Sequence, residues 1–391
     1  MAITILFWCL CFSLGYLLFT SIIIIRNRFD LEALPMQRSA LHEELKISVC
    51  IPARNEEKNL ARLLSSLVNQ SCTNYNVYVL DDQSDDNTPN ILKSFHKQHP
   101  ALITVLQGKT KPDDWLGKPW ACEQLGMAAD GNILLFLDAD TAVQPDTLKG
   151  ISNAFEKYGA DMITVWPQQI LGTFWEKTVI PLIYYALVSI LPAIYVYRKP
   201  RWMPSFLYKK LSGSFAAANG QCVAFRKEAY RSIGGHLSVK SEVVEDVQLA
   251  KNVKSNGMRL RMFHGVGSVS CRMYTSNKEM FQGLRKNFLA GFNNSISIFL
   301  LAAIVHIVVF ILPLFSLFLS LSIFAPFIFY LSLASITLIL MQRLVLSFWF
   351  RWDPIFSFTH PLGVLWFQWL GIVKVYDYAT GRKTNWKGRS V

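Results

Sequence analysis

Apolar residues are distributed along the chain in two ways, as long uninterrupted runs and as short runs between polar segments. The long runs lie at the start of the chain, near 178–197 and beyond 295, whereas the short runs lie within 47–165. A run of about 20 apolar residues is long enough for a helix to cross a bilayer. A run of four to eight is typical of a buried strand. The pattern therefore predicts an α/β domain joined to membrane helices.

Within 47–165 the short apolar runs alternate with segments of helical periodicity. Leu60, Leu63, Leu64 and Leu67 have the spacing of an amphipathic helix. This alternation predicts right-handed βαβ units on a mainly parallel sheet. The expected strands are 47–51, 77–80, 103–106, 133–137, 162–165 and, later in the chain, 219–225.

The first apolar run, residues 3–25, carries no charge and is followed by Arg26 and Arg28. It lacks the basic start and the cleavage site of a signal peptide, so it predicts a transmembrane anchor over 1–28. Basic residues favour the cytoplasmic side of a membrane helix. We therefore expect a multi-pass protein of the cell membrane with its α/β domain, residues 45–292, in the cytoplasm.

The apolar segment 178–197 lies inside that domain and contains Pro181 and Pro192. An ordinary crossing here would place residues 138 and 245 on opposite sides of the membrane. We predict an interfacial or re-entrant insert instead, with an ordinary crossing as the alternative. Apolar runs within 293–376 predict C-terminal transmembrane or interfacial helices, and 377–391 a basic cytoplasmic tail.

Composition narrows the class of protein further. The chain has 39 basic and 27 acidic residues, a net charge of +12, and 52% of its residues are hydrophobic. The basic residues flank apolar runs, which suits an anionic membrane surface better than nucleic acid, and no nucleic-acid-binding signature is present. The seven cysteines lack metal-site spacing, which favours a reduced, cytoplasmic domain.

Two carboxylates, Asp138 and Asp140, follow directly after the expected strand 133–137. In extended backbone their side chains project to the same side. They also lie at the carboxyl end of a strand, where open α/β sheets bind ligands. Such oxygen donors suit Mg²⁺ or Mn²⁺ and the phosphates that the ion carries. The alternative interpretation is a solvated acidic turn.

Two further acidic pairs are candidates for the same site. Asp81 and Asp82 end another expected strand and could hydrogen-bond a base or a ribose, although aspartates are also common in turns. Glu245 and Asp246 open an expected helix, where the helix dipole favours acids whatever their role. The functional interpretation makes one of the second pair a general base for an acceptor hydroxyl.

Six motifs, in order, resemble those of the membrane-bound members of glycosyltransferase family 2. They are Ile-Pro-Ala-Arg-Asn-Glu-Glu at 51–57, Asp-Asp at 81–82, Gly-Lys at 117–118, Asp-Ala-Asp at 138–140, Glu-Asp at 245–246 and Gln-Gly-Leu-Arg at 282–285. The resemblance covers nearly the whole chain. It implies a Rossmann-like GT-A fold, a nucleotide-diphosphate-sugar donor, a divalent metal and inversion at the anomeric carbon.

The resemblance also implies roles by position. The donor would be bound by Pro52, Arg54, Glu56, Asp81, Asp82, Lys118, Asp138 and Gln282, with Asp81 and Asp82 on the uracil or ribose and Lys118 on the diphosphate. Asp140 would ligate the metal, with Asp138 on the ribose or the metal. Asp246 would be the base, with Glu245 as its substitute. Arg285 would grip the diphosphate through bidentate bonds, the alternative being a basic flank of the membrane segment.

Lys286 stands where the family's Gln-x-x-Arg-Trp motif has its tryptophan, which argues against a processive polysaccharide synthase. Shorter motifs at 117–122, 272–274, 360–361 and 386–389 resemble bacterial carotenoid-acid (diaponeurosporenoate-type) and hopanoid-associated glycosyltransferases. We therefore expect transfer of a hexose, glucose first, from a UDP-sugar to a carotenoid or related terpenoid dissolved in the bilayer. A hopanoid, sphingoid, diacylglycerol or polyprenyl phosphate acceptor is the alternative.

Two other classes of protein fit parts of the sequence. Asp138-x-Asp140 also resembles the nucleophile motif of haloacid-dehalogenase phosphatases, but there the strand begins the domain and Thr or Val replaces Ala142. A non-enzymatic membrane scaffold or lipid carrier could retain the fold. The intact set of acids argues against this alternative, because a protein that only binds a ligand has no need of Glu245 and Asp246.

Overall fold

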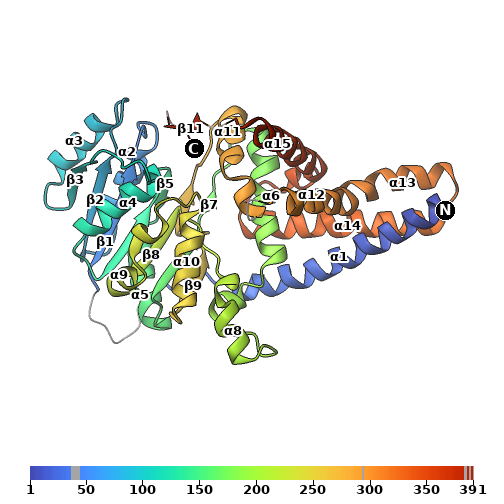
Figure 1. Ribbon diagram of the computed structural model, residues 1–391, viewed down its shortest axis with the longest axis horizontal. Coiled ribbons are helices and arrows are strands. Elements are labelled where there is room, and N and C mark those ends of the chain that lie inside the picture. Colours follow the sequence, from blue (N-terminus) through green and yellow to red (C-terminus); the bar gives the residue numbers. More distant parts are fainter. Residues whose placement is uncertain (37–44, 293–294, 383–384, 387–388, 391) are drawn as a thin grey trace. The chain divides into compact units, whose positions relative to one another are not determined.

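The computed structural model describes residues 1–36, 45–292, 295–382, 385–386 and 389–390. The chain divides into two compact units (Figure 1). The sheet unit consists of Leu31–Ile170 and Ala193–Met273, and the helical unit of Met1–Asp30, Leu171–Pro192 and Tyr274–Val391. The predicted domain 45–292 differs from the sheet unit, because Leu171–Pro192 and the residues after Met273 belong to the helical unit.

A seven-stranded sheet with the order β3-β2-β1-β4-β8-β6-β9 forms the centre of the sheet unit. Its strands are β1 (Ile47–Ala53), β2 (Tyr75–Asp81), β3 (Ile103–Gln107), β4 (Ile133–Leu137), β6 (Met162–Trp166), β8 (Cys222–Arg226) and β9 (Leu260–His264). Strand β8 runs antiparallel to β4 and β6, and the other neighbours are parallel. The predicted mainly parallel α/β sheet is confirmed. The reversal of strand order places the topological switch point between β1 and β4.

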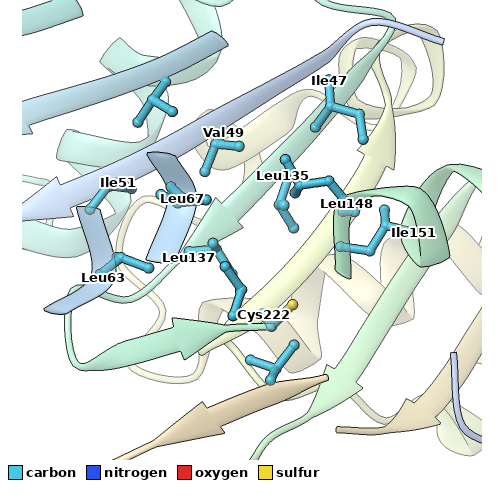
Figure 2. Packing of buried hydrophobic residues seen from close by; sticks show 14 of the residues in the cluster. Ile47, Val49, Ile51, Leu63, Leu67, Leu135, Leu137, Leu148, Ile151 and Cys222 are labelled. Carbon is cyan, nitrogen blue, oxygen red and sulfur yellow. The ribbon is translucent and has the colours of Figure 1, made fainter. Parts of the chain in front are cut away.

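The helices of this unit are α2 (Leu60–Val68), α3 (Thr88–Gln98), α4 (Gly117–Ala128), α5 (Thr147–Tyr158), α7 (Ile194–Tyr197), α8 (Ser205–Leu211), α9 (Lys227–Ser232) and α10 (Glu245–Ser255). On one face of the sheet, Val49 and Leu135 pack with Leu63 of α2 (Figure 2). The next residue of β4, Phe136, points to the other face, where its ring lies 4.8 Å from that of His236. Each such buried apolar side chain stabilises the fold by roughly 1.5–3 kcal/mol.

A second, three-stranded sheet follows the β4 carboxylates. Its order is β5 (Thr141–Val143), β10 (Val269–Cys271) and β7 (Gln168–Gln169), with β10 antiparallel to β5 and parallel to β7. Cys271 pairs with Thr141 in this register. The chain after Asp140 is therefore tied to a segment about 130 residues further on.

The helical unit consists mainly of α1 (Ala2–Asp30), α6 (Phe174–Ile190), α11 (Asn277–Asn287), α12 (Ile296–His306), α13 (Leu312–Ser322), α14 (Pro326–Trp349) and α15 (His360–Thr380). Three stretches among the described residues, Ala2–Asp30, Ile296–Ser322 and Pro326–Trp349, have the length and apolar character needed to cross a membrane. Helix α15, which contains most of the apolar run 356–373, is not one of them. The predicted N-terminal and C-terminal membrane helices thus have three candidates.

The predicted insert 178–197 falls mainly on α6. The helix begins at Phe174, after a capping box in which the backbone amide of Glu176 donates to Thr173 Oγ1 and the Thr173 hydroxyl donates to Glu176 Oε1. Most of its later residues are buried within the helical unit. The interfacial or re-entrant position of this segment in a membrane stays a prediction.

Buried polar groups join the helices of this unit. Gln342 Nε2 of α14 donates to the carbonyl of Leu17 at 2.7 Å, and the Tyr185 hydroxyl of α6 donates to Gln342 Oε1. Asn27 Nδ2 of α1 donates to the carbonyl of Val188 at 2.8 Å. Because buried polar groups are costly to leave unpaired, these bonds fix how α1, α6 and α14 pack.

The predicted basic tail is described in part. Asn385–Trp386 and Arg389–Ser390 form the short antiparallel strands β11 and β12. Lys383, Lys387 and Gly388, which belong to the predicted tail and its motif, lie outside the described residues.

Candidate active site

The loops after β1 and β2 are hydrogen-bonded to each other beside the switch point. The amide of Asn55 donates to Ser84 Oγ at 3.0 Å, and the amide of Asp85 donates to Asn55 Oδ1 at 2.8 Å. The amide of Glu56 donates to Thr88 Oγ1 at 2.8 Å. Asn55 has a positive φ of 55°, a conformation that asparagine tolerates better than most residues. The two loops therefore form one braced structure.

Asp81 and Asp82 lie in this braced region and are both buried. Asp81 Oδ1 accepts a hydrogen bond from the amide of Ser84 at 3.1 Å. Arg54 Nη1 donates to the Asp82 carbonyl at 2.6 Å. Gly108 follows β3, and a Cβ atom on it would lie 3.0 Å from the Asp81 carbonyl oxygen. The edge that carries both aspartates thus leaves no room for a side chain at residue 108.

Two other residues of the predicted donor set also lie at the end of β1. Pro52 is in β1, opposite Leu80 of β2. The Glu56 carbonyl accepts hydrogen bonds from the amides of Asn59 and Leu60, and Glu56 Oε2 accepts one from Asn59 Nδ2 at 3.0 Å. The structure therefore brings Pro52, Arg54 and Glu56 next to Asp81 and Asp82.

The turn after β4 holds Asp138 and Asp140 in place through the backbone. The amide of Asp138 donates to the Gln221 carbonyl at 3.1 Å, and the Asp138 carbonyl accepts from Thr141 Oγ1 at 2.7 Å. The Asp140 carbonyl accepts from the amide of Arg272 at 3.2 Å and from the guanidinium of Arg62. Both carboxylates therefore extend from a fixed turn at the carboxyl edge of the sheet.

Lys118 joins the acid after β4 to the acid that opens α10. Its ammonium nitrogen lies 2.8 Å from Asp138 Oδ1 and 3.0 Å from Glu245 Oε1, and it donates to the Gly220 carbonyl at 3.3 Å. Burial lowers the pKa of Lys118, but the charges of Asp138 and then Glu245 outweigh it and hold the pKa well above its ordinary value. Lys118 is therefore a permanent cation in this structure.

Asp246 belongs to the same network through Gly220. The amide of Gly220 donates to Asp246 Oδ2 at 2.5 Å. Burial, together with the neighbouring charge of Glu245, raises the pKa of Asp246 to about 7. Burial also acts to raise the pKa of Glu245, but the Lys118 charge outweighs it, so the pKa of Glu245 is lowered. The two adjacent acids thus differ in protonation near neutral pH.

The sequence interpretation missed a polar network on the other side of this turn. The Cys271 thiol hydrogen-bonds the Asp140 carboxylate, and Gln221 Nε2 donates to Cys271 Sγ at 2.9 Å. Gln169 Nε2 donates to Gln221 Oε1 at 2.8 Å. Burial and the Asp140 charge hold the pKa of Cys271 well above its ordinary value, so the thiol stays neutral and can donate. Asn219-Gly220 before a strand is a turn signal, but nothing in the sequence links it to residue 246.

Gln282 and Arg285, the remaining predicted residues, lie on α11 in the helical unit. Gln282 is exposed. The Arg285 guanidinium makes a bidentate ion pair with the buried carboxylate of Asp377, with Nε donating to Oδ2 at 2.6 Å. Their contact with a diphosphate stays a prediction.

Asp138 and Asp140 have the donor chemistry expected of a divalent cation site. Among the described residues, no three His, Cys, Asp or Glu side chains gather into a group able to hold a metal by themselves. Mg²⁺ is commonly held by one or two carboxylates together with substrate phosphates. The two aspartates fit a metal that arrives with a phosphate-bearing ligand.

Comparison with protein families gives two matches. Residues 48–234 match the model of glycosyl transferase family 2, and residues 195–387 match that of glycosyl transferase family 21. The first match contains the strands β1 to β8 together with Asp81, Asp82, Lys118, Asp138 and Asp140.

Individual proteins are also similar. The 4,4'-diaponeurosporenoate glycosyltransferases of Staphylococcus aureus strains USA300 and MRSA252 are each 27% identical over 244 residues, which is 62% of this chain. The match spans 59% of the length of those relatives. The solved mannosyltransferase PcManGT from Pyrobaculum calidifontis, in complex with GDP-Man and Mn²⁺, is 15% identical, with a TM-score of 0.53, over 95% of this chain and 99% of that one. That likeness shows a shared fold.

Proposed function

We propose that this chain, whose residues 48–234 match the model of glycosyl transferase family 2, is an inverting transferase that moves a hexose from a UDP-sugar to a membrane-dissolved lipid. The observation that carries the proposal is the Lys118 network, which joins Asp138 to Glu245 and, through Gly220, to Asp246. Glycosyl transfer needs charge neutralisation for the departing diphosphate and a base for the acceptor, both in one site. The network combines a permanent cation with a carboxylate of near-neutral pKa.

Asp246 is the base in this proposal. Its pKa of about 7 leaves much of it ionised at neutral pH, while its conjugate acid is weak enough to give a useful driving force for proton transfer. Glu245 is the poorer candidate, because its carboxylate is already paired with Lys118. The difference in environment between these adjacent acids therefore selects Asp246 and gives Glu245 an electrostatic role.

The donor lies along the carboxyl edge of β1, β2 and β4. Asp81 and Asp82, braced beside Arg54, hold the uracil or ribose. Lys118 lies at the start of α4, where the helix dipole also favours negative charge, and it contacts the diphosphate. Asp138 and Asp140 hold Mg²⁺ or Mn²⁺, which when bound neutralises charge on the diphosphate.

Association with a bilayer is supported in each unit by different features. The helical unit contains the three stretches of sufficient length and apolar character. In the sheet unit, residues 198–211 contain five basic and no acidic residues. Trp202 and Phe206 in this segment are 68% and 78% exposed. Aromatic and basic side chains together suit the surface of an anionic leaflet. We therefore propose a multi-pass membrane protein with its sheet unit in the cytoplasm.

The acceptor is proposed to be a carotenoid or related terpenoid, with glucose as the sugar. The support is the similarity to 4,4'-diaponeurosporenoate glycosyltransferases, at 27% identity over part of each chain. A hopanoid, sphingoid, diacylglycerol or polyprenyl phosphate acceptor would leave the reacting residues unchanged. The family match and the joined acids disfavour a scaffold or lipid carrier.

The test is to incubate membranes that contain the full chain with radiolabelled UDP-glucose and other UDP-sugars, and to identify the lipid that gains label. Membranes that lack the chain are the control for background transferases. We expect label from UDP-glucose in a terpenoid fraction, absent from the control. Equal labelling in both membranes would refute the proposed transferase activity. Label in another lipid class would change the proposed acceptor and leave the proposed transferase activity supported.

A further inference from the structure

Two basic side chains are buried in the helical unit with no acidic partner among its described residues. Arg343 of α14 and His360, at the start of α15, are each 1% exposed. Within the part of the chain that the structure describes, Arg343 Nε and Nη1 and both ring nitrogens of His360 have no hydrogen-bond partner. Arg343 Nη2 lies 3.4 Å from the Phe356 carbonyl, a long hydrogen bond. Most of the donor capacity of this Arg343–His360 cluster is therefore unused.

The surroundings of the cluster are aromatic and already paired. The His360 ring lies 4.8 Å from that of Phe310 and 5.3 Å from that of Tyr185. The Tyr185 hydroxyl donates a hydrogen bond to Gln342 Oε1. Arg343 and His360 interact electrostatically with each other. In the ion pairs found among the described residues, no carboxylate is joined to Arg343.

An unpaired buried guanidinium is energetically unfavourable, because desolvation of a charge is compensated only by an opposite charge and full hydrogen bonding. Arginine does not escape this cost by losing its proton, unlike lysine or histidine. Arg343 also lies in Pro326–Trp349, a stretch able to cross a membrane. Ionisable residues in such helices mark ligand sites and have a partner. The missing partner is therefore an anion.

We infer that Arg343 and His360 bind the oxyanion group, a carboxylate or a phosphate, of a lipid dissolved in the membrane. The planar guanidinium suits both groups, because its parallel N–H donors match two oxygens at once. An N–H of His360 can reach the same anion. An apolar tail explains how the ligand enters aromatic surroundings that would exclude a hydrated ion.

The apolar outer surface of the same helix supports a lipid. Along α14, the side chains of Met341, Val345 and Phe348 are exposed near Arg343 in the sequence. A hydrocarbon chain can cover such side chains while its head group reaches the buried cation. The inference concerns the helical unit alone and does not depend on the transfer reaction proposed above.

Oleate is a suitable probe, with oleyl alcohol as its uncharged match. The full chain is purified in a neutral detergent at about pH 9, where the fatty acid is ionised. Bound oleate is measured by native mass spectrometry, and its effect on thermal unfolding is measured in parallel. We expect oleate to raise the unfolding temperature of the wild-type chain, and oleyl alcohol, sodium acetate and inorganic phosphate to have no comparable effect.

Arg343→Gln is the test variant and Arg351→Gln is its matched control, since Arg351 is an exposed arginine eight residues further on. We expect Arg343→Gln to weaken oleate binding by about tenfold or more and Arg351→Gln by less than about twofold. Equal binding by the Arg343→Gln variant and the wild type would overturn the inference. Acetate or phosphate acting as strongly as oleate would also overturn it, because the site would then take a free ion.

Arg343→Met keeps the test decisive if the glutamine variant does not fold. Replacing an uncompensated buried charge by an apolar side chain of similar length should leave the unfolding temperature in lipid-free detergent equal or higher. Oleate should no longer raise it. The lipid site would be refuted if the Arg343→Met variant unfolds at a lower temperature than the wild type and oleate does not change the unfolding temperature of the wild type. Arg343 would then have a purely structural role.

Discussion

The ammonium group of Lys118 lies 2.8 Å from Asp138 Oδ1 and 3.0 Å from Glu245 Oε1. Asp138 follows β4 and Glu245 opens α10, so one cation connects two elements that are more than 100 residues apart. Opposite charges at this distance interact strongly in a partly buried site. Lys118 therefore contributes to the charge balance around Asp246.

Removing that charge should shift the acid–base behaviour of the site. In Lys118→Gln, the pKa values of Glu245 and Asp246 should both rise, because the Lys118 charge lowers each of them. The rising limb of the pH–rate profile should move to higher pH, with a weaker affinity for UDP. Lys240→Gln, which removes a surface lysine paired with Asp114, is the control. An unchanged profile and UDP affinity would contradict the role of Lys118.

Asp246→Asn should abolish transfer while leaving the donor bound. Loss of a general base typically reduces the rate by about 10²–10⁴-fold. UDP affinity, measured by calorimetry, should change by less than about twofold, because asparagine keeps the carbonyl oxygen that accepts from Gly220. Glu242→Gln, at an exposed acid three residues before Glu245, should remain active. Normal turnover by the Asp246→Asn variant would assign the base elsewhere.

The raised pKa of Asp246 predicts opposite pH trends for activity and stability. Activity should rise as pH passes through about 7, because the base must be ionised. The folded state favours the protonated form of Asp246. The resulting stabilisation is fully present below the pKa that Asp246 has in the unfolded chain, and it is lost as pH rises through the pKa that Asp246 has in the folded chain. Thermal unfolding should therefore occur at lower temperature at pH 8 than at pH 6. The Asp246→Asn variant should show a smaller fall in unfolding temperature between pH 6 and pH 8 than the wild type. An identical fall in both proteins would refute the raised pKa of Asp246.

Asp140→Asn should remove the dependence of nucleotide binding on a divalent cation. Titration of UDP with and without Mg²⁺ or Mn²⁺ measures this effect, since a carboxamide is a weaker ligand for a hard cation than a carboxylate. Asp113→Asn, at an exposed aspartate, should keep the wild-type dependence. If the metal titration of the Asp140→Asn variant is unaltered, the metal assignment fails.

Gly220→Ala should disturb the site without unfolding the protein. A Cβ atom at this residue would lie 3.1 Å from Lys118 Nζ and 3.2 Å from Asp246 Oδ2, so both side chains would have to move. We expect at least about a tenfold loss of kcat, because small misplacement of reacting groups is costly. Gly15→Ala is the control, since nothing lies within 4 Å of its added Cβ atom. Full activity of the Gly220→Ala variant would show that the network tolerates rearrangement.

The strands of the sheet could be predicted because their apolar runs are short and bounded by turn residues. The expected strand 133–137 coincides with β4. Strand direction is not encoded in an apolar run, so the antiparallel β8 between β4 and β6 could not be foreseen. The short strand β10 is also set by its partners and not by its own pattern.

The acids of the site could be proposed from their motifs, but their mutual contacts could not. No local pattern relates Lys118 to Glu245 or Gly220 to Asp246, because each contact is formed by tertiary packing. Arg343 illustrates the same limit. Its charge suggests a polar connector, whereas α14 continues through it to Trp349 and buries it. Burial of a charge is decided by neighbouring helices and not by its own segment.

The cross-bonded loops after β1 and β2 have a consequence for nucleotide selection. Hydrogen bonds made by Asn55 fix these loops to each other, so little conformational entropy of the loops remains to be lost when a ligand binds there. Affinity is then set by how well the ligand fits rigid walls. For the donor site proposed above, loops fixed in advance select among nucleotides by steric fit and by the pairing of polar groups.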